Sequence, residues 1–212
     1  MPISTGWIPM RSPHFIATVS VALLLLVAVL SMSNGINAET TYGSMTPQQL
    51  AQRIERQWPR ELRSRNRDSG SCVFVSTETL ARTMGNDRLA DYISRNFRGG
   101  EYASRMNRKL DRLNVRYAMT DQGDSQFLDW ALGNTTGAKR GACITLKGPH
   151  MLNLVHLDPP GTPGARAIII DNNFPNRQET WTRDRLIRDW RRRGGWAFTI
   201  FDGSPPPPRP RF

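Results

Sequence analysis

The sequence contains few cysteines and few acidic residues. Only Cys72 and Cys143 occur among 212 residues, which excludes a dense disulfide framework and a four-cysteine zinc site. Lys and Arg number 29 against 18 Asp and Glu, so the formal net charge is +11. We therefore expect electrostatic attraction to anionic partners such as phosphate backbones, anionic lipids or acidic polysaccharides.

One long apolar run lies near the N-terminus. The uncharged segment Phe15–Leu30 follows Arg11 and precedes the small and polar residues 31–38, which is the layout of a secretory signal. The run falls short of the roughly 20 residues that a helix needs to span a bilayer. We expect residues 1–38 to be a signal peptide or, as the alternative, a membrane anchor through residues 15–30. Either interpretation predicts export, to the outside of the cell or to the periplasm or cell envelope.

The length and composition favour one globular domain. A chain of 212 residues can bury one core but not two large ones. A hydrophobic share of 38% and a charged share of 22% exclude wholesale disorder, a multi-span membrane protein and a collagen-like fibre. After the export segment we place an N-terminal helix and basic connector at 39–68, the main domain at 69–203 and a Pro-rich tail at 204–212.

The hydrophobic pattern changes from helical to β-rich along the chain. Helical spacing and capping residues predict helices that begin at Pro47, Cys72, Asn86 or Asp87, near Tyr102, and after Asp124. Short β-rich runs then predict strands at 142–146, 151–157, 165–171 and 196–201, with one helix capped near Thr182. Helices followed by a mostly antiparallel sheet make an α+β domain.

The helix that begins at Cys72 favours a reactive thiol. Unpaired N–H groups and the macrodipole at a helix N-terminus lower the pKa of a thiol and stabilise the thiolate. A neighbouring imidazole would form an ion pair with it, and a third polar group would orient that imidazole. His14 lies in the predicted export segment, which leaves His150 and His156 as candidates.

His150 is the preferred partner of the thiol. It lies where a strand begins, so a loop can bring it to the edge of the sheet. His156 lies deeper in the same strand, and strict alternation places it on the face of Leu152 and Leu154 as a packed residue. The following strand ends in residues 171–173, which supply acceptor side chains behind the imidazole.

The order of three short motifs resembles that of the papain-like cysteine peptidases. Gly70-Ser71-Cys72 opens a hydrophobic helix, Gly148-Pro149-His150 opens a strand, and Ile170-Asp171-Asn172 closes the next strand. The likeness is nearest to the bacterial peptidase C39-like branch and covers approximately Ser69–Phe201. It implies a papain-like α+β fold in which N-terminal helices pack on a mostly antiparallel C-terminal sheet.

The resemblance also implies a role for each motif residue. Cys72 would be the nucleophile, His150 the base and Asp171 the orienting acid, with Asn172 as the papain-style alternative. In papain-like enzymes a Gln six residues before the cysteine helps to hold the oxyanion, and Asn66 occupies that position with the same amide on a shorter side chain. The implied reaction is thiolate attack on an acyl carbonyl followed by hydrolysis of a thioester. Neither a metal nor another cofactor is expected.

Other interpretations compete at several of these positions. Cys72 could be a small core residue, or it could form a disulfide with Cys143, which we instead expect to be a buried free thiol. The two histidines of one strand are six residues apart, about 20 Å by strand rise, so they cannot share a metal ion. The basic run 191–193 is typical of a solvated helix end, and we do not expect a nucleic-acid partner.

Two functions from different classes follow. The first is an exported cysteine hydrolase that cleaves peptide or isopeptide bonds in a peptide or protein substrate, with transglutaminase-like acyl transfer as a close variant. The second is a noncatalytic basic binding module of the cell envelope that keeps the fold and binds an anionic envelope polymer. The charge of +11 and the short amide at Asn66 motivate the second function. A membrane partner is expected only if the N-terminal segment is not cleaved.

Overall fold

The described part of the chain comprises residues 45–133, 141–146 and 149–200 of a computed structural model. The predicted export segment 1–38, Phe201 at the end of the last predicted strand, and the predicted tail 204–212 lie outside these residues. Within the described ranges, no helix combines the length and the apolar character that crossing a bilayer requires.

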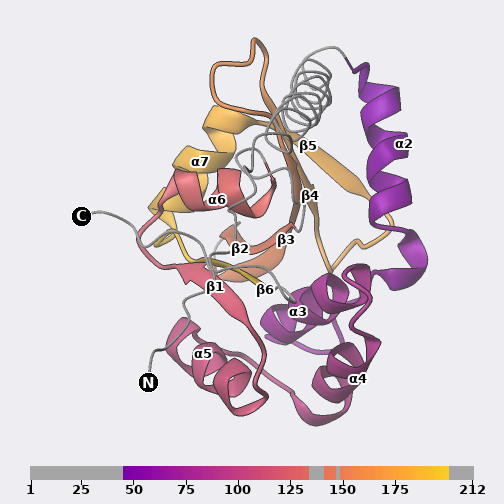
Figure 1. The fold of residues 1–212 in the computed structure, drawn as a ribbon, viewed down its shortest axis with the longest axis vertical. Coiled ribbons are helices and arrows are strands. Elements are labelled where there is room, and N and C mark those ends of the chain that lie inside the picture. Colours follow the sequence, from indigo (N-terminus) through magenta and orange to yellow (C-terminus); the bar gives the residue numbers. More distant parts are fainter. Residues whose placement is uncertain (1–44, 134–140, 147–148, 201–212) are drawn as a thin grey trace, which may run out of the picture. The chain divides into compact units, whose positions relative to one another are not determined.

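The described residues form a mixed α/β structure with one antiparallel sheet (Figure 1). The helices are α2 (Pro47–Gln57), the 3-10 helix η1 (Arg60–Leu62), α3 (Cys72–Thr83), α4 (Asp87–Asn96), α5 (Ala103–Arg112), α6 (Ser125–Ala131) and α7 (Arg183–Arg192). The strands are β1 (Tyr117–Thr120), β2 (Ala142–Leu146), β3 (His150–Leu157), β4 (Arg166–Ile170), β5 (Gln178–Thr182) and β6 (Ala197–Ile200). Their order is β1-β6-β2-β3-β4-β5, and each neighbouring pair is antiparallel.

Capping side chains set the starts of four predicted helices. Thr46 and Gln49 form a reciprocal capping box before α2, in which Thr46 Oγ1 accepts from the Gln49 N–H at 3.2 Å. Asn86, Asp124 and Thr182 each accept a first-turn N–H of α4, α6 and α7. Each cap satisfies a donor that the helix itself leaves unpaired, so these predictions from the sequence are confirmed.

Helices cover both faces of the sheet. On one face, Cys143 of β2 and Met151 of β3 join an apolar cluster with α2, α3, α4 and α5. On the other face, Ile144 and Leu152 join a cluster with α6 and α7. The alternation of side chains along each strand divides the core in this way. The expected α+β class is confirmed, but the helices do not all lie on one side of the sheet.

The central helix α3 is more buried than its sequence predicts. The spacing indicates one apolar face, whereas every residue from Cys72 to Ala81 is buried. The polar side chains among them bond to neighbouring elements, as when Ser76 Oγ donates to Met151 O at 3.2 Å. A helix enclosed on all sides can hold its first residue in a fixed place against the sheet.

The two edge strands were not predicted. β5 has the sequence QETWT and is only partly buried, so it lacks the apolar alternation that marks a strand. β1 is a four-residue strand, and Ala118 is its only buried residue. Edge strands pair on one side only and carry little of the core, so the hydrophobic pattern identifies them poorly.

A bulge in β3 also changes the predicted orientation of His156. The register of β3 against β4 shifts between Leu154 and His156, so His156 pairs with Ile168. Directly opposed residues share a face, and Ile168 belongs to the cluster on the α3 side of the sheet. His156 therefore does not share the face of Leu152 and Leu154, because the extra residue of a bulge reverses the alternation.

Candidate active site

Three elements bring the sequence-predicted residues together. Cys72 is the first residue of α3, His150 is the first residue of β3, and Asp171 directly follows β4. The antiparallel pairing of Asn153 with Ile170 places the end of β4 alongside the start of β3. The start of α3 lies against the same place, since the side chain of Asn172 bonds to the backbone of Cys72 and of β3.

The Cys72 thiol is poised to ionise. It is 6% exposed, and the side chain of the N-cap residue Ser71 accepts no hydrogen bond from the first-turn N–H groups of α3, so these donors can stabilise a thiolate at Cys72. Burial opposes the thiolate, but a hydrogen bond with His150, bonds to the backbone of Met151 and Val73, and the imidazole charge together lower the pKa of Cys72 below its ordinary 9.0. The sulfur also lies 3.9 Å from Gly70 O.

His150 is shifted in the complementary direction. Its Nε2 lies 2.8 Å from Asp171 Oδ1, and the ring is partly buried. Burial alone would lower its pKa, but the hydrogen bonds with Asp171 and Cys72, and their negative charges, raise the pKa of His150 to about 9. Because Nε2 is held by the carboxylate, Nδ1 is the ring nitrogen left for the thiol. The lowered pKa of Cys72 and the raised pKa of His150 each favour the charged form, so the arrangement favours a thiolate beside an imidazolium, and the two groups titrate as a pair.

Asp171 is the carboxylate that orients the imidazole. Its side chain is buried, and Oδ1 accepts a second hydrogen bond from the backbone N–H of Asn173 at 2.9 Å. The side-chain nitrogen of Asn173 lies 3.3 Å from His150 Nε2. Sequence reasoning gave Asn173 no separate role, and its place in the polar run 171–173 was the only signal that could have done so.

Asn172 has a different function from the one that the resemblance offers as an alternative. Its side-chain nitrogen donates to Cys72 O at 3.1 Å, to Met151 O at 3.0 Å and to Ser76 Oγ at 2.9 Å. It therefore does not orient His150. Asn172 lies in the turn that the Phe174 N–H closes by donating to Asp171 O at 2.8 Å, and there its side chain bonds α3 and β3 while that of Asp171 bonds the imidazole. The Asn172 side chain instead clamps Cys72 at the start of α3 to Met151 of β3.

Asn66 reaches the site but is held by a neighbour. Its backbone N–H donates to Asn172 O at 2.9 Å, which ties the loop before α3 to the end of β4. Its side-chain amide donates to Asn173 Oδ1 at 2.6 Å. An amide carries two N–H groups, so one bonds Asn173 and the other is the one that could meet an oxyanion.

Cys143 is a second buried thiol and not a partner of Cys72. Both cysteines are free, which contradicts the alternative of a disulfide and agrees with the expected free thiol at Cys143. Cys143 is fully buried in β2, and burial raises the pKa of its thiol far above the ordinary range, against hydrogen bonds with Thr77 and Asn153. Its thiolate is therefore strongly disfavoured.

His156 belongs to a separate buried network. Its Nε2 lies 2.8 Å from Asp158 Oδ1, while Asp158 Oδ2 accepts from the backbone N–H of Arg166 at 2.8 Å. Burial alone would raise the pKa of Asp158, but these hydrogen bonds and the neighbouring charges lower it to about 2. His156 is thus a packed histidine, as expected. In the described ranges no group of three or more His, Cys, Asp or Glu side chains could hold a metal ion.

No protein-family model, curated protein or solved structure matches the chain. The geometry around Cys72 and His150 therefore carries the functional conclusion. That geometry brings together a thiol, an imidazole and a carboxylate, which are the three kinds of group that acyl transfer through a thiol uses.

Loss of the imidazole should make Cys72 a slow nucleophile at neutral pH. In a Cys143→Ala background, we expect iodoacetamide to alkylate Cys72 at least about tenfold more slowly in His150→Ala, because the bond and the charge that lower the thiol pKa are lost. The difference should shrink as the pH rises past about 9, where His150 loses its proton and the variant thiol ionises. Equal rates at neutral pH would contradict the ion pair.

Substitution of Asp171 should change the reactivity of Cys72, whereas substitution of its neighbour Asn172 should change the stability of the fold. Asp171→Asn should slow the same alkylation at neutral pH, because an amide does not support the imidazolium charge.

Asn172→Ala should lower the free energy of unfolding by about 2–3 kcal/mol, because two carbonyl groups and Ser76 lose a buried donor. Urea denaturation and alkylation kinetics measure the two effects. If Asn172→Ala had the same free energy of unfolding as the wild type, the stabilising role of the Asn172 hydrogen bonds would be refuted.

Proposed function

We propose that the protein is an exported cysteine hydrolase that cleaves peptide or isopeptide bonds. Cys72 is the nucleophile, His150 carries the proton and Asp171 orients His150. The observation that carries the proposal is the geometry of the site, in which Cys72 begins α3, His150 begins β3 and Asp171 Oδ1 lies 2.8 Å from His150 Nε2. The pKa of the Cys72 thiol is lowered and that of His150 is raised to about 9, in agreement with this geometry. Opposed shifts of this kind are typical of paired catalytic groups.

The reaction begins when the Cys72 thiolate attacks the carbonyl carbon of the substrate. The carbonyl π electrons move to oxygen, and we assign the backbone N–H of Cys72 and the second N–H of the Asn66 amide as the donors that meet that charge. One such donor is worth about 3 kcal/mol in comparable sites. The His150 imidazolium then gives its proton to the leaving amine, and a thioester remains on Cys72. A water molecule gives a proton to neutral His150 while its oxygen attacks the thioester carbonyl. The C–S bond then breaks, the carboxylic acid product leaves, and the thiolate–imidazolium pair is restored.

A papain-like fold of the C39-like kind is part of this proposal. Its support is the order of the site residues along the elements: a cysteine that begins a helix, a histidine that begins a strand, and an acid that follows the next antiparallel strand. The burial of α3 against the sheet supports it further, since the helix presents its first residue at the start of β3. The same elements thus hold the three groups in one place.

A noncatalytic module that binds an anionic polymer is the second candidate. The observation that favours it is a row of exposed arginines on and after α7: Arg185, Arg188, Arg192 and Arg193. Because α7 covers the face of the sheet opposite to α3, binding there would not depend on Cys72. This candidate predicts that Cys72 behaves as an ordinary thiol.

A thiol-directed peptidyl probe distinguishes the two candidates. We expect a peptidyl acyloxymethyl ketone to label the wild-type chain at neutral pH and to leave Cys72→Ala unlabelled. Cys143→Ala is the matched control and should be labelled like the wild type, because its thiol is fully buried and its thiolate is disfavoured. Intact-mass measurement reads the adduct. Equal labelling of the wild type and Cys72→Ala would refute the hydrolase and leave the binding module.

A further inference from the structure

The loop before Cys72, residues 64–71, is held by several hydrogen bonds. At its start, the Ser64 N–H donates to Thr79 Oγ1 at 2.9 Å, which ties the loop to α3. At its end, Ser71 Oγ accepts from the N–H groups of Arg67 and Asp68 at 3.3 and 3.4 Å. This loop carries Asn66 and leads directly into the backbone N–H of Cys72, so it presents both proposed oxyanion donors.

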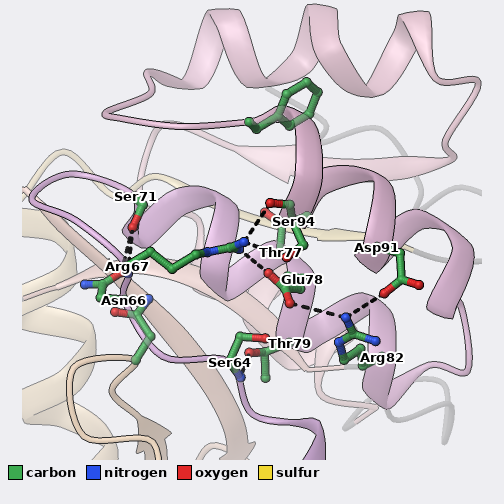
Figure 2. Close-up of polar contacts among 12 residues, drawn as sticks. Ser64, Asn66, Arg67, Ser71, Thr77, Glu78, Thr79, Arg82, Asp91 and Ser94 are labelled. Atoms are coloured by element: carbon green, nitrogen blue, oxygen red, sulfur yellow. Dashed lines mark hydrogen bonds and ion pairs between the residues drawn. The ribbon is translucent and has the colours of Figure 1, made fainter.

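Arg67 reaches from this loop to two helices. Its Nη1 donates to Ser94 O at 2.7 Å and to Ser94 Oγ at 2.5 Å, and its Nη2 bonds Glu78 Oε2. Figure 2 shows the guanidinium directed between Ser94 of α4 and Glu78 of α3, away from the loop that it anchors. One planar group with donors on separate nitrogens therefore fixes the loop to both helices, in a geometry that the compact ammonium of a lysine does not reproduce in full.

Glu78 makes this anchor stiff. Its side chain is 7% exposed, whereas that of Arg67 is 30% exposed, so solvent screens the pair less than a surface pair. Glu78 Oε1 also lies 3.4 Å from Arg82 Nη2, and the same Arg82 nitrogen donates to Asp91 Oδ1 at 2.8 Å. The charges alternate along the series Arg67, Glu78, Arg82 and Asp91. This network ties the loop, α3 and α4 into one unit (Figure 2).

We propose that Arg67 is a positioning residue of the hydrolase: through Glu78 and Ser94 it fixes the loop that presents Asn66 and the Cys72 N–H to the developing oxyanion. The inference rests on the proposed function. Oxyanion donors act only when they stand about 2.7–3.1 Å from the oxygen, so a loosened loop loses their effect. Ionisation of Cys72 depends instead on His150, which belongs to β3 and not to the loop.

Two reagents separate these effects. In alkylation by iodoacetamide, the Cys72 sulfur displaces iodide from a saturated carbon, and no charge develops on an oxygen. With a peptidyl aldehyde, the thiolate adds to the carbonyl carbon, the π electrons move to oxygen, and that oxygen takes the His150 proton to give a hemithioacetal. The first reagent reports the thiolate, and the second reports the thiolate together with the oxyanion donors.

In the full chain, we expect Arg67→Ala to weaken the binding of the peptidyl aldehyde to Cys72 at least about tenfold. Iodoacetamide should alkylate Cys72 in Arg67→Ala within about threefold of the wild-type rate, since the ion pair is intact. Arg65→Ala is the matched control, because Arg65 is an exposed arginine of the same loop, and it should leave both reactions unchanged. Arg67→Lys, which keeps the charge near Glu78, should lie between the wild type and Arg67→Ala.

Equal changes with both reagents, or an unchanged aldehyde affinity in Arg67→Ala, would overturn the positioning role. If Arg67→Ala does not fold, Arg67→Lys carries the same comparison. Hydrogen exchange gives a readout independent of catalysis: the Asn66 N–H, which bonds Asn172 O, should lose protection in both Arg67 variants and keep it in Arg65→Ala. A wild-type Cys72 that reacts with neither reagent would refute the proposed hydrolase. Unchanged hydrogen exchange of the Asn66 N–H in the Arg67 variants would refute the anchoring of the loop by Arg67.

Discussion

The contact between the Cys72 thiol and the His150 imidazole is the constraint on which the rest of the site depends. Burial disfavours the thiolate and the imidazolium when each stands alone, and the hydrogen bond and charge of the partner offset part of that cost for both groups. The pair therefore requires α3 and β3 to meet at their first residues. Asp171 completes it by binding the far side of the ring at 2.8 Å.

That meeting of helix and strand is maintained by buried amides. Asn172 joins Cys72 to Met151 across the interface, and Asn153 donates to Ser76 O of α3 at 2.9 Å. Such groups must be bonded to be tolerated in a core, so they hold one arrangement and disfavour others. Within the described part of the chain, the side-chain oxygen of Asn172 has no hydrogen-bond partner. The unpaired oxygen of Asn172 thus costs some stability, while its nitrogen holds Cys72 of α3 next to Met151 of β3.

The sequence predicted the elements whose signals are local. The helix at Cys72 follows from apolar spacing and ends where Gly85 adopts a positive φ, and the paired histidine follows from the start of an apolar strand. It could not predict the bulge that turns His156, because a one-residue shift leaves no hydrophobic signature. Nor could it decide between Asp171 and Asn172, since the turn after β4 sets which of the two side chains faces the ring. The Arg67 anchor depends on the path of a loop, which spacing does not encode.

The protonation state of His150 tests the ion pair most directly. Nitrogen-15 NMR of the full chain, with His150→Gln used for assignment, reports whether both ring nitrogens carry protons. At neutral pH we expect a charged ring that loses its proton near pH 9, and in Cys72→Ala we expect this midpoint to fall. A ring that is already neutral at pH 7 in the wild type, with shifts that Cys72→Ala leaves unchanged, would contradict the account.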